Sequence, residues 1–262
     1  MRYKTVHLIY FSPTHTSAKI AYAIAEGMAT VMMSESNVTF DAPAAEEDID
    51  DELTIVAAPV YGGRVAETAV ERFRMFRSMH HAPVVPVVLY GNRDYEDALR
   101  ELCDLMTEQG FLPVAAGAFV GEHSFSRKDM PVAEGRPDER DIAVAVDFGR
   151  RIIDKLEQVS CIECLPALHV KGNYPYREKS PSTPMAPVTD SALCTRCGYC
   201  VDVCPTRAIT PTDEGMYSDP ALCIKCCACV KECPEGARTF DTPFTAMLHK
   251  NFSARREPEC FL

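Results

Sequence analysis

The sequence has little positive charge: 27 Lys and Arg residues stand against 38 Asp and Glu residues, which gives a net charge of −11. An acidic surface repels the phosphates of nucleic acid, so we expect no nucleic-acid partner. It favours redox partner proteins, including basic ones that opposite charge would steer. A homodimer is a separate option. The sequence also lacks an apolar run long enough to span a bilayer.

Several motifs of common enzymes are absent as well. Neither G-x-x-x-x-G-K-[ST] nor G-x-G-x-x-G occurs, so neither a nucleoside triphosphate nor a Rossmann dinucleotide is indicated. No Ser/His/Asp or paired-carboxylate arrangement typical of a hydrolase is visible. The N-terminal apolar segment, residues 6–11, is too short for a signal peptide and indicates a strand.

Cysteine, in contrast, is abundant, with thirteen residues in the chain. With no signal peptide expected, we predict a cytoplasmic protein in a reducing compartment. In such a compartment, clustered cysteines are more often metal ligands than partners in disulfide bonds.

Eight of the cysteines form an internal repeat. Cys194, Cys197, Cys200 and Cys204 recur 29 residues later, and each copy reads C-x2-C-x2-C-x3-C-P; the second set is Cys223, Cys226, Cys229 and Cys233. A fifth cysteine of the second copy, Cys227, stands where the first copy has Gly198, so Cys227 is the extra one.

This spacing is typical of two [4Fe–4S] clusters. Three thiolates at successive i, i+3 positions wrap one cluster, and the fourth cysteine reaches the other cluster. We expect two ligand sets: Cys194, Cys197, Cys200 and Cys233 for the first cluster, and Cys204, Cys223, Cys226 and Cys229 for the second. Zinc is the alternative, but zinc sites usually use two separated C-x2-C pairs. The segment 188–241 resembles bacterial two-cluster ferredoxins.

The first 160 residues alternate strand and helix signals. We expect strands at 5–11, 38–40, 53–60, 84–90 and 114–120, and helices at 16–30, 68–79, 95–109 and 138–159. This alternation predicts an α/β fold with a five-stranded parallel, flavodoxin-like sheet of order 2-1-3-4-5, followed by a small α+β two-cluster ferredoxin domain.

Ligands bind such sheets at the carboxyl ends of the strands, so the loops there are candidates for a cofactor site. The first loop offers hydroxyls beside a helix N-terminus, which suits a phosphate. The other two pair glycines with aromatic residues, which suits a planar ring. Together they indicate FMN, although each motif alone is also typical of a helix cap or turn. The three loops contain Ser12, Thr14, His15, Thr16 and Ser17; Pro59, Val60, Tyr61, Gly62 and Gly63; and Tyr90, Gly91, Asn92, Arg93, Asp94 and Tyr95.

Residues 1–160 resemble flavodoxins, whose phosphate loop usually has glycine where this chain has His15. The resemblance implies that the hydroxyls of residues 12–17 hold the phosphate. It implies that Tyr61–Gly63 lie beside flavin N5 and that residues 92–95 flank the pyrimidine side of the ring.

The order of the two parts resembles a family of small flavodoxin–ferredoxin fusions of anaerobic prokaryotes, which are regarded as electron carriers. We therefore expect an electron-transfer protein that couples FMN to two low-potential clusters. The alternative is an FMN-dependent reductase of a small organic acceptor, which a pocket lined by His15, Tyr95 or Phe125 would favour.

The remaining segments leave further options open. We expect residues 161–187 to form a linker or a strap, and residues 242–262 to pack back on the flavodoxin-like domain as a helix. The acidic run 41–52 is a solvated loop or a docking site. The loop 123–137 is a surface loop or a cover over the flavin. Cys161 and Cys164 are ordinary thiols, a redox dithiol or part of a third metal site.

Overall fold

The protein is described from a computed structural model over residues 5–29, 32–50, 52–179 and 183–262. Parts of the sequence predictions lie outside these described residues: residues 1–4 of the domain predicted at 1–160, residue 30 of the helix predicted at 16–30, residue 51 of the acidic run, and residues 180–182 of the expected linker.

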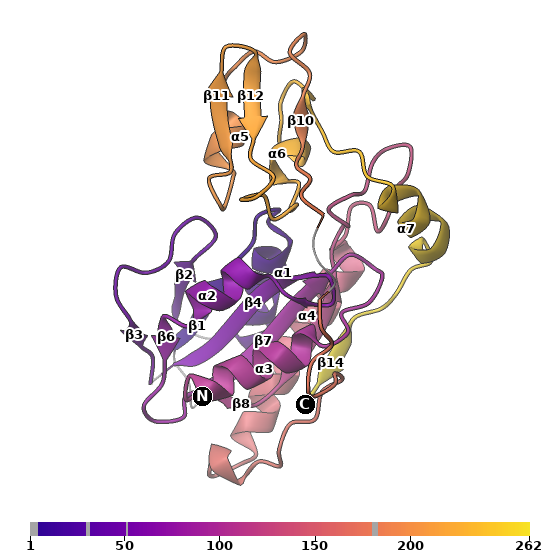
Figure 1. The fold of residues 1–262 in the computed structure, drawn as a ribbon. Coiled ribbons are helices and arrows are strands. Elements are labelled where there is room, and N and C mark those ends of the chain that lie inside the picture. The colour runs from indigo at the N-terminus through magenta and orange to yellow at the C-terminus, as the bar shows by residue number, and fades with distance from the viewer. Residues whose placement is uncertain (1–4, 30–31, 51, 180–182) are drawn as a thin grey trace.

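A mostly parallel sheet forms the larger part of the molecule (Figure 1). Its main strands follow the order β14-β9-β7-β4-β1-β2. Their bounds are Thr5–Tyr10 for β1, Met32–Asn37 for β2, Leu53–Tyr61 for β4, Pro83–Tyr90 for β7, Ala116–Val120 for β9 and Glu259–Phe261 for β14. The parallel strands lie in the order β2-β1-β4-β7-β9, which is the predicted order 2-1-3-4-5, so the flavodoxin-like topology is confirmed. The remaining strand, β14, is antiparallel to β9 and was not predicted.

The second strand was predicted in the wrong place. Residues 38–40 are not a strand, and the edge strand β2 lies just before them. Most of its side chains are exposed, so it has no apolar alternation that a sequence pattern could detect. Its side chains instead bind the neighbouring strand: the two ring nitrogens of His7 lie 2.7 Å from Ser34 Oγ and 3.0 Å from Ser36 Oγ.

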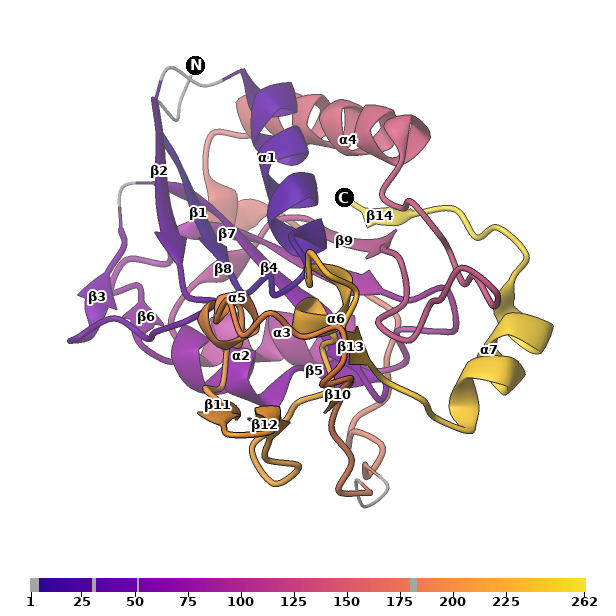
Figure 2. The ribbon, with the colours of Figure 1, turned by 90° about the horizontal axis from the view of Figure 1, so that it is seen from above.

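Two helices cover each face of the sheet (Figure 2). Helices α1 (Thr16–Met28) and α4 (Glu139–Glu157) pack on one core, and α2 (Glu67–Phe73) and α3 (Ala98–Glu108) pack on the other. The first pair approaches closely because each helix contributes a glycine at the contact. A Cβ on Gly27 would lie 1.9 Å from Val146 O, and one on Gly149 would lie 2.0 Å from Ile24 O.

Short strands complete this part. Strand β5 (Arg64–Val65) pairs with β4, and β8 (Leu112–Pro113) pairs with β7. Helix α2 ends before the predicted residue 79, because β6 (Phe76–Arg77) leaves the helix to pair with β3 (Glu47–Asp48). The acidic run is held at several points: Arg77 forms ion pairs with Glu46 and Asp48 at 2.6 Å each, and Asp50 accepts from Ser78 Oγ at 2.8 Å.

The cysteine-rich part lies above the carboxyl ends of the parallel strands (Figure 1). It contains two antiparallel pairs and two short helices. These are β10 (Val188–Thr189) with β13 (Arg238–Thr239), β11 (Ile209–Thr212) with β12 (Gly215–Ser218), α5 (Tyr199–Asp202) and α6 (Ala228–Lys231).

The segment between the two parts runs as a strap along α3, after a short 3-10 helix at Ile162–Cys164. Asp97 accepts hydrogen bonds from the backbone N–H groups of Asn173, at 2.8 Å, and Arg177, at 2.7 Å. The hydroxyl of Tyr176 donates to Asp104 at 2.7 Å. Of the two options for this segment, the described residues therefore fit the strap.

The C-terminal tail crosses back to the sheet. Helix α7 (Phe244–Phe252) projects at the side of the molecule, and the chain then descends to form β14 at the sheet edge (Figure 1). The tail thus contains a helix, but its pairing with the sheet is made by a strand. Among the described helices, none combines the length and the apolar character needed to cross a bilayer.

Candidate cofactor sites

The loop after β1 forms a tight turn into α1. His15 has a left-handed backbone, with φ of 62°, at the position where the flavodoxin phosphate loop usually has glycine. Its N–H donates to Ser12 O at 3.1 Å, and Ser12 Oγ accepts from the N–H of Ala18 at 3.1 Å. Histidine is one of the few side chains that adopt this conformation with some frequency, so the turn forms without glycine.

This turn fits a phosphate group. Thr16 and Ser17 are the first two residues of α1, so their N–H groups have no acceptor within the helix. The hydroxyl of Ser17 is buried and has no hydrogen-bond partner. A buried hydroxyl without a partner is costly, and a phosphate oxygen at the helix N-terminus would satisfy it.

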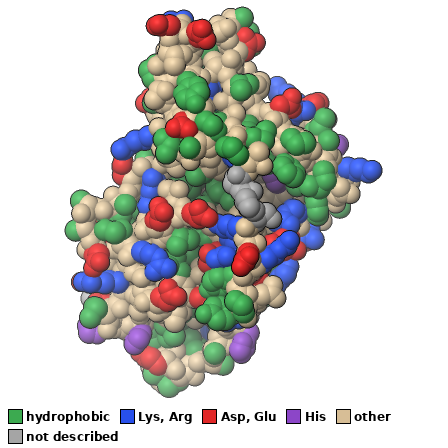
Figure 3. Space-filling view, in the orientation of Figure 1, with side chains coloured by type: hydrophobic (Ala, Val, Ile, Leu, Met, Phe, Trp, Pro, Cys, Tyr) green, Lys and Arg blue, Asp and Glu red, His purple; other side chains and the backbone are tan. Residues whose placement is uncertain are grey.

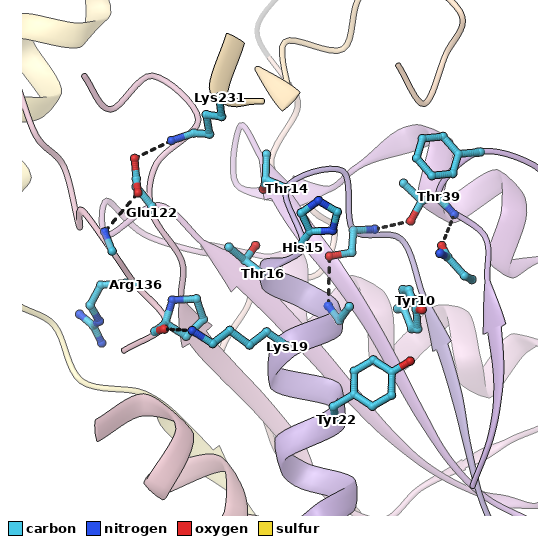
Figure 4. A pocket seen from close by; sticks show the side chains of 16 residues that line it. Tyr10, Thr14, His15, Thr16, Lys19, Tyr22, Thr39, Glu122, Arg136 and Lys231 are labelled. Atoms are coloured by element: carbon cyan, nitrogen blue, oxygen red, sulfur yellow. Dashed lines mark hydrogen bonds and ion pairs between the residues drawn. The ribbon is translucent and has the colours of Figure 1, made fainter. Parts of the chain in front are cut away.

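A cavity of about 610 Å³ lies beside this turn (Figure 4). Residues from both parts of the chain line it: Tyr10, Ser12, Thr14, His15, Thr16, Ala18, Lys19, Tyr22, Asn37, Thr39, Phe40, Glu122, Gly135, Arg136, Pro137 and Lys231. Its cations already have partners. Lys19 Nζ donates to Pro137 O at 2.7 Å, Arg136 pairs with the buried Asp141, and Lys231 Nζ lies 2.5 Å from Glu122 Oε1.

The loop after β4 meets the cysteine-rich part. Gly62 and Gly63 have positive φ angles of 63° and 79°, which turn the chain from β4 into β5. Tyr61 and Ile224 both pack against the core below α2 and α3. Burial, together with the nearby thiols of Cys226, Cys227 and Cys223, raises the pKa of the Tyr61 hydroxyl. This loop and the segment that holds most of the second ligand set therefore pack against the same core.

The loop after β7 is bound by the strap and the tail. Asn92 Nδ2 donates to Phe252 O at 2.5 Å and to Ala254 O at 2.8 Å, while Asn92 Oδ1 is buried without a partner. Tyr95 is fully buried, and its hydroxyl donates to Glu259 at 2.8 Å. Lys171 of the strap pairs with Asp94 at 3.0 Å.

The structure thus brings only some of the predicted cofactor residues to one cavity. Four residues of the first loop line the 610 Å³ cavity, and Ser17 is buried in the first turn of α1. Residues 59–63 and 90–95 do not line it. Of the three residues that would mark a reductase pocket, only His15 lines the cavity. Tyr95 is buried in the core, and the ring of Phe125 packs on that of Phe240 with centroids 5.2 Å apart.

His123 was not singled out from the sequence, because a lone histidine in a polar loop gives no signal. It packs against Gly91, where a Cβ would lie 2.4 Å from His123 Cδ2. Burial lowers the pKa of His123 to about 4, and the charges of Lys231 and Arg93 act in the same direction. The ring is therefore neutral at pH 7, and its Nδ1 accepts from the N–H of Phe125 at 3.0 Å.

The cysteines of the repeat surround two separate cavities. The first is lined by Cys194, Cys197, Cys200 and Cys233, the set predicted for the first cluster. The second is lined by the predicted second set, Cys204, Cys223, Cys226 and Cys229, and also by Cys227. Within the described ranges, no three Cys, His, Asp or Glu side chains are grouped as ligands of a single metal ion.

The two cavities differ in exposure. Cys197 of the first set is exposed, and all residues that line that cavity come from positions 194–238. In the second set, Cys226 and Cys229 are buried. Burial raises the pKa of the Cys229 thiol to about 11, with Arg238 acting in the opposite direction, and burial also raises the pKa of Cys226. These thiols need a bound cation, such as cluster iron, to be held as thiolates.

Cys227 takes the backbone conformation of the glycine it replaces. Its φ is 59° at the N-terminus of α6, and Gly198 has φ of 84° at the N-terminus of α5. The Cys227 side chain is buried, and its Sγ lies 3.6 Å from Lys225 O. The alignment with Gly198 therefore extends to the local geometry.

The other four cysteines do not gather at one place. Cys103 belongs to the core on one face of the sheet, and Cys260 packs against the core on the opposite face. Cys161 Sγ donates to Glu163 at 2.8 Å, and Cys164 is exposed. A third site that combines Cys103 and Cys260 is excluded by the sheet between them.

Comparison with known families identifies the cysteine-rich part. Residues 193–245 match the family described as the 4Fe-4S dicluster domain. The chain thus joins a flavodoxin-like sheet to a ferredoxin-type 4Fe-4S domain. These features support iron–sulfur binding and an electron-transfer or oxidoreductase role. No curated protein matches the chain in sequence.

Solved structures align with more than half of the chain. A flavodoxin from the domain Archaea has 15% identity and a TM-score of 0.36, over 58% of this chain and 99% of its own. Fusobacterium nucleatum flavodoxin bound to flavin mononucleotide has 14% identity and a TM-score of 0.36, over 59% and 98%.

The rubredoxin oxygen:oxidoreductase of Desulfovibrio gigas has 14% identity and a TM-score of 0.40. The alignment covers 59% of this chain and 36% of the oxidoreductase, so this chain spans only about a third of its length. Because these TM-scores lie below 0.5, the flavodoxin-like assignment rests on the strand order itself.

Proposed function

We propose that the protein is an intracellular electron carrier that couples FMN to two low-potential [4Fe–4S] clusters. The observation that supports this most is the packing of Ile224, which follows the ligand Cys223, against the same core that Tyr61 contacts. Tyr61 lies close to the thiols of Cys223, Cys226 and Cys227. A flavin beside Tyr61 would therefore be near the second cluster, and transfer between them would need no collision between molecules.

The first cluster is the proposed point of exchange with partner proteins. Its ligand Cys197 is exposed, and Leu193 and Tyr199, next to ligands of the same set, are 52% and 45% exposed. Apolar side chains gather on this smaller part of the molecule, and charged side chains of both signs cover much of the sheet-containing part (Figure 3). An apolar area around an exposed redox centre suits brief docking, and the net charge of −11 favours a basic partner protein.

The proposed FMN site combines the three loops. When bound, FMN exchanges one or two electrons, whereas each cluster exchanges one. The N–H groups of Thr16 and Ser17 and the hydroxyl of Ser17 would hold the phosphate. Residues 59–63 would orient the ring towards the second cluster, and the buried loop at residues 90–95 would exclude water from its other side.

Electron transfer is favoured here over reduction of an organic acceptor. A reductase needs an open pocket over the flavin for its acceptor. Phe125 and Tyr95, which would line such a pocket, are instead packed against Phe240 and within the core. The proposal also places the protein in the reducing cytoplasm, because its many thiols would be oxidised elsewhere.

Anaerobic reconstitution tests the proposal. We expect about eight irons and eight sulfides per chain, as two four-iron clusters require, and one FMN. After rapid reduction of the clusters, flavin reduction should proceed at a rate that does not depend on protein concentration. A rate proportional to protein concentration would show transfer between molecules and contradict the proposal, as would a chain that binds clusters but no FMN.

A further inference from the structure

Arg238 is a buried cation between the two cluster cavities. It lies on β13 and is only 3% exposed. Its Nη1 donates to Thr189 Oγ1 at 2.6 Å and to Met216 O at 3.0 Å. Its Nη2 donates to Ser218 Oγ and lies 3.6 Å from Cys229 Sγ, a ligand of the proposed second cluster. Arg238 also lines the first cavity.

No carboxylate balances this charge. Every acceptor of Arg238 is a neutral oxygen or a cysteine sulfur, its Nε has no acceptor, and no described Asp or Glu forms an ion pair with it. Burying a guanidinium without a counter-charge is strongly unfavourable. The thiolate-ligated clusters are the negative groups that this position would face, and they would balance the charge.

The internal repeat shows that the hydrogen bond from Arg238 to sulfur is present in one ligand set only. The 29-residue offset that aligns Cys229 with Cys200 aligns Arg238 with Ile209. Ile209 is buried, lines the second cavity and cannot donate a hydrogen bond from its side chain. The bond of Arg238 to Cys229 Sγ therefore has no side-chain counterpart from Ile209 to Cys200 in the first ligand set.

We propose that Arg238 raises the reduction potential of the second cluster above that of the first. The charge of Arg238 lies close to both ligand sets, but its N–H···S hydrogen bond is made to the second set only. Such a bond stabilises the additional negative charge of a reduced cluster, and hydrogen bonds to sulfur are a recognised control of cluster potential. An electron that enters at the exposed first cluster is then drawn inward to the second, which faces Tyr61. This inference rests on the proposed two-cluster function and assigns the direction of transfer within it.

Redox titration of the reconstituted full chain, followed by EPR, tests the assignment. In Arg238→Gln, the equilibrium constant for reduction of the second cluster should fall at least tenfold, which corresponds to about 59 mV for one electron. The first cluster should shift less. Arg238→Lys, which keeps the charge, should shift the second cluster less than Arg238→Gln does. The two signals are assigned with Cys197→Ser, which changes a ligand of the first cluster only.

Arg207→Gln is the matched control, because Arg207 belongs to the same cysteine-rich part as Arg238 but is exposed and paired with Asp41 of the sheet-containing part. Its charge is screened by water, so its removal should change both equilibrium constants less than about twofold. Equal shifts of both clusters in Arg238→Gln, no shift, or an equal shift in Arg238→Lys would each overturn the inference.

The wild-type protein gives an independent test if the Arg238 variants do not fold. Its second cluster must have the higher potential, and the reverse order overturns the inference. These outcomes are distinct from failure of the proposed function. A wild-type chain that does not assemble two clusters would contradict the proposed function itself. Two assembled clusters of equal potential would contradict only the role assigned to Arg238.

Discussion

Ser17→Ala should make the flavin-free protein more stable and bind FMN more weakly. The Ser17 side chain is 1% exposed in the first turn of α1, and its hydroxyl has no hydrogen-bond partner. The protein without a ligand therefore buries a polar group that it does not satisfy. The same group is available to a phosphate oxygen, so the two effects of its removal have opposite signs.

The magnitudes follow from the cost of burying a polar group. An unsatisfied buried hydroxyl costs about 1–3 kcal/mol, so its removal should raise the free energy of unfolding by up to that amount. Alanine also has a higher helix propensity than serine, by about 0.5 kcal/mol. A hydrogen bond to a charged phosphate contributes about 1.5–3 kcal/mol, which corresponds to a 10- to 150-fold increase in the Kd for FMN.

Urea unfolding of the cluster-loaded, flavin-free protein measures the first effect, and quenching of FMN fluorescence on binding measures the second. Thr54→Val is the matched control, because Thr54 Oγ1 is also buried without a partner but lies on β4, away from the loop. It should stabilise the protein and leave the Kd unchanged. If Ser17→Ala lowers stability and leaves the Kd unchanged, the hydroxyl does not face a ligand and the phosphate assignment is wrong.

Three further predictions concern the cluster segment, His123 and the tail. Cys227→Gly should retain both clusters, because glycine suits the φ of 59°, whereas Cys226→Ala should lose the second cluster; iron and sulfide analysis distinguishes them. The pKa of His123 is lowered to about 4 in the folded chain, so only the unfolded chain gains a proton as the pH falls from about 6.5 towards 4. Stability should therefore fall over that range, and His123→Asn should reduce the loss in urea unfolding measured at pH 7 and pH 5. Deletion of residues 253–262 removes β14 and the Glu259 partner of the buried Tyr95 hydroxyl, which should cost at least about 1–3 kcal/mol in the same assay.

The parts of the structure that the sequence predicts best are those determined by local patterns. The two ligand sets follow from a spacing within each copy of the repeat, and the same eight cysteines line the two cavities. The four buried or half-buried parallel strands contain enough apolar residues to be recognised, and their alternation with helices gives the strand order. The sequence departs from the flavodoxin phosphate-loop pattern at His15, so the left-handed turn there is learned from the structure.

The parts that were missed depend on contacts between distant residues. The edge strand β2 is mostly exposed and is specified by its pairing with β1, including the bonds of His7 to Ser34 and Ser36. Strand β14 is only three residues long, and it forms as a strand because it pairs with the edge of β9. The closure of the loop at residues 90–95 depends on the strap and the tail, which lie more than seventy residues away in sequence.

The interface between the sheet and the cysteine-rich part is formed by residues of both parts, so neither part alone determines how the proposed cofactors are arranged. On the side of the sheet it includes His15, Arg72, Tyr61 and Glu122. His15 meets Glu232 at 3.1 Å, Lys231 meets Glu122 at 2.5 Å, and Arg72 donates to Pro205 O at 2.8 Å. Such polar contacts contribute little stability each, so they fix orientation more than affinity. Ile224 packs against the same core as Tyr61, and this apolar contact further restricts the relative position of the two parts. The separation of the second ligand set from the loop at residues 59–63 is therefore set by a few side chains whose sequence neighbours give no sign of their partners.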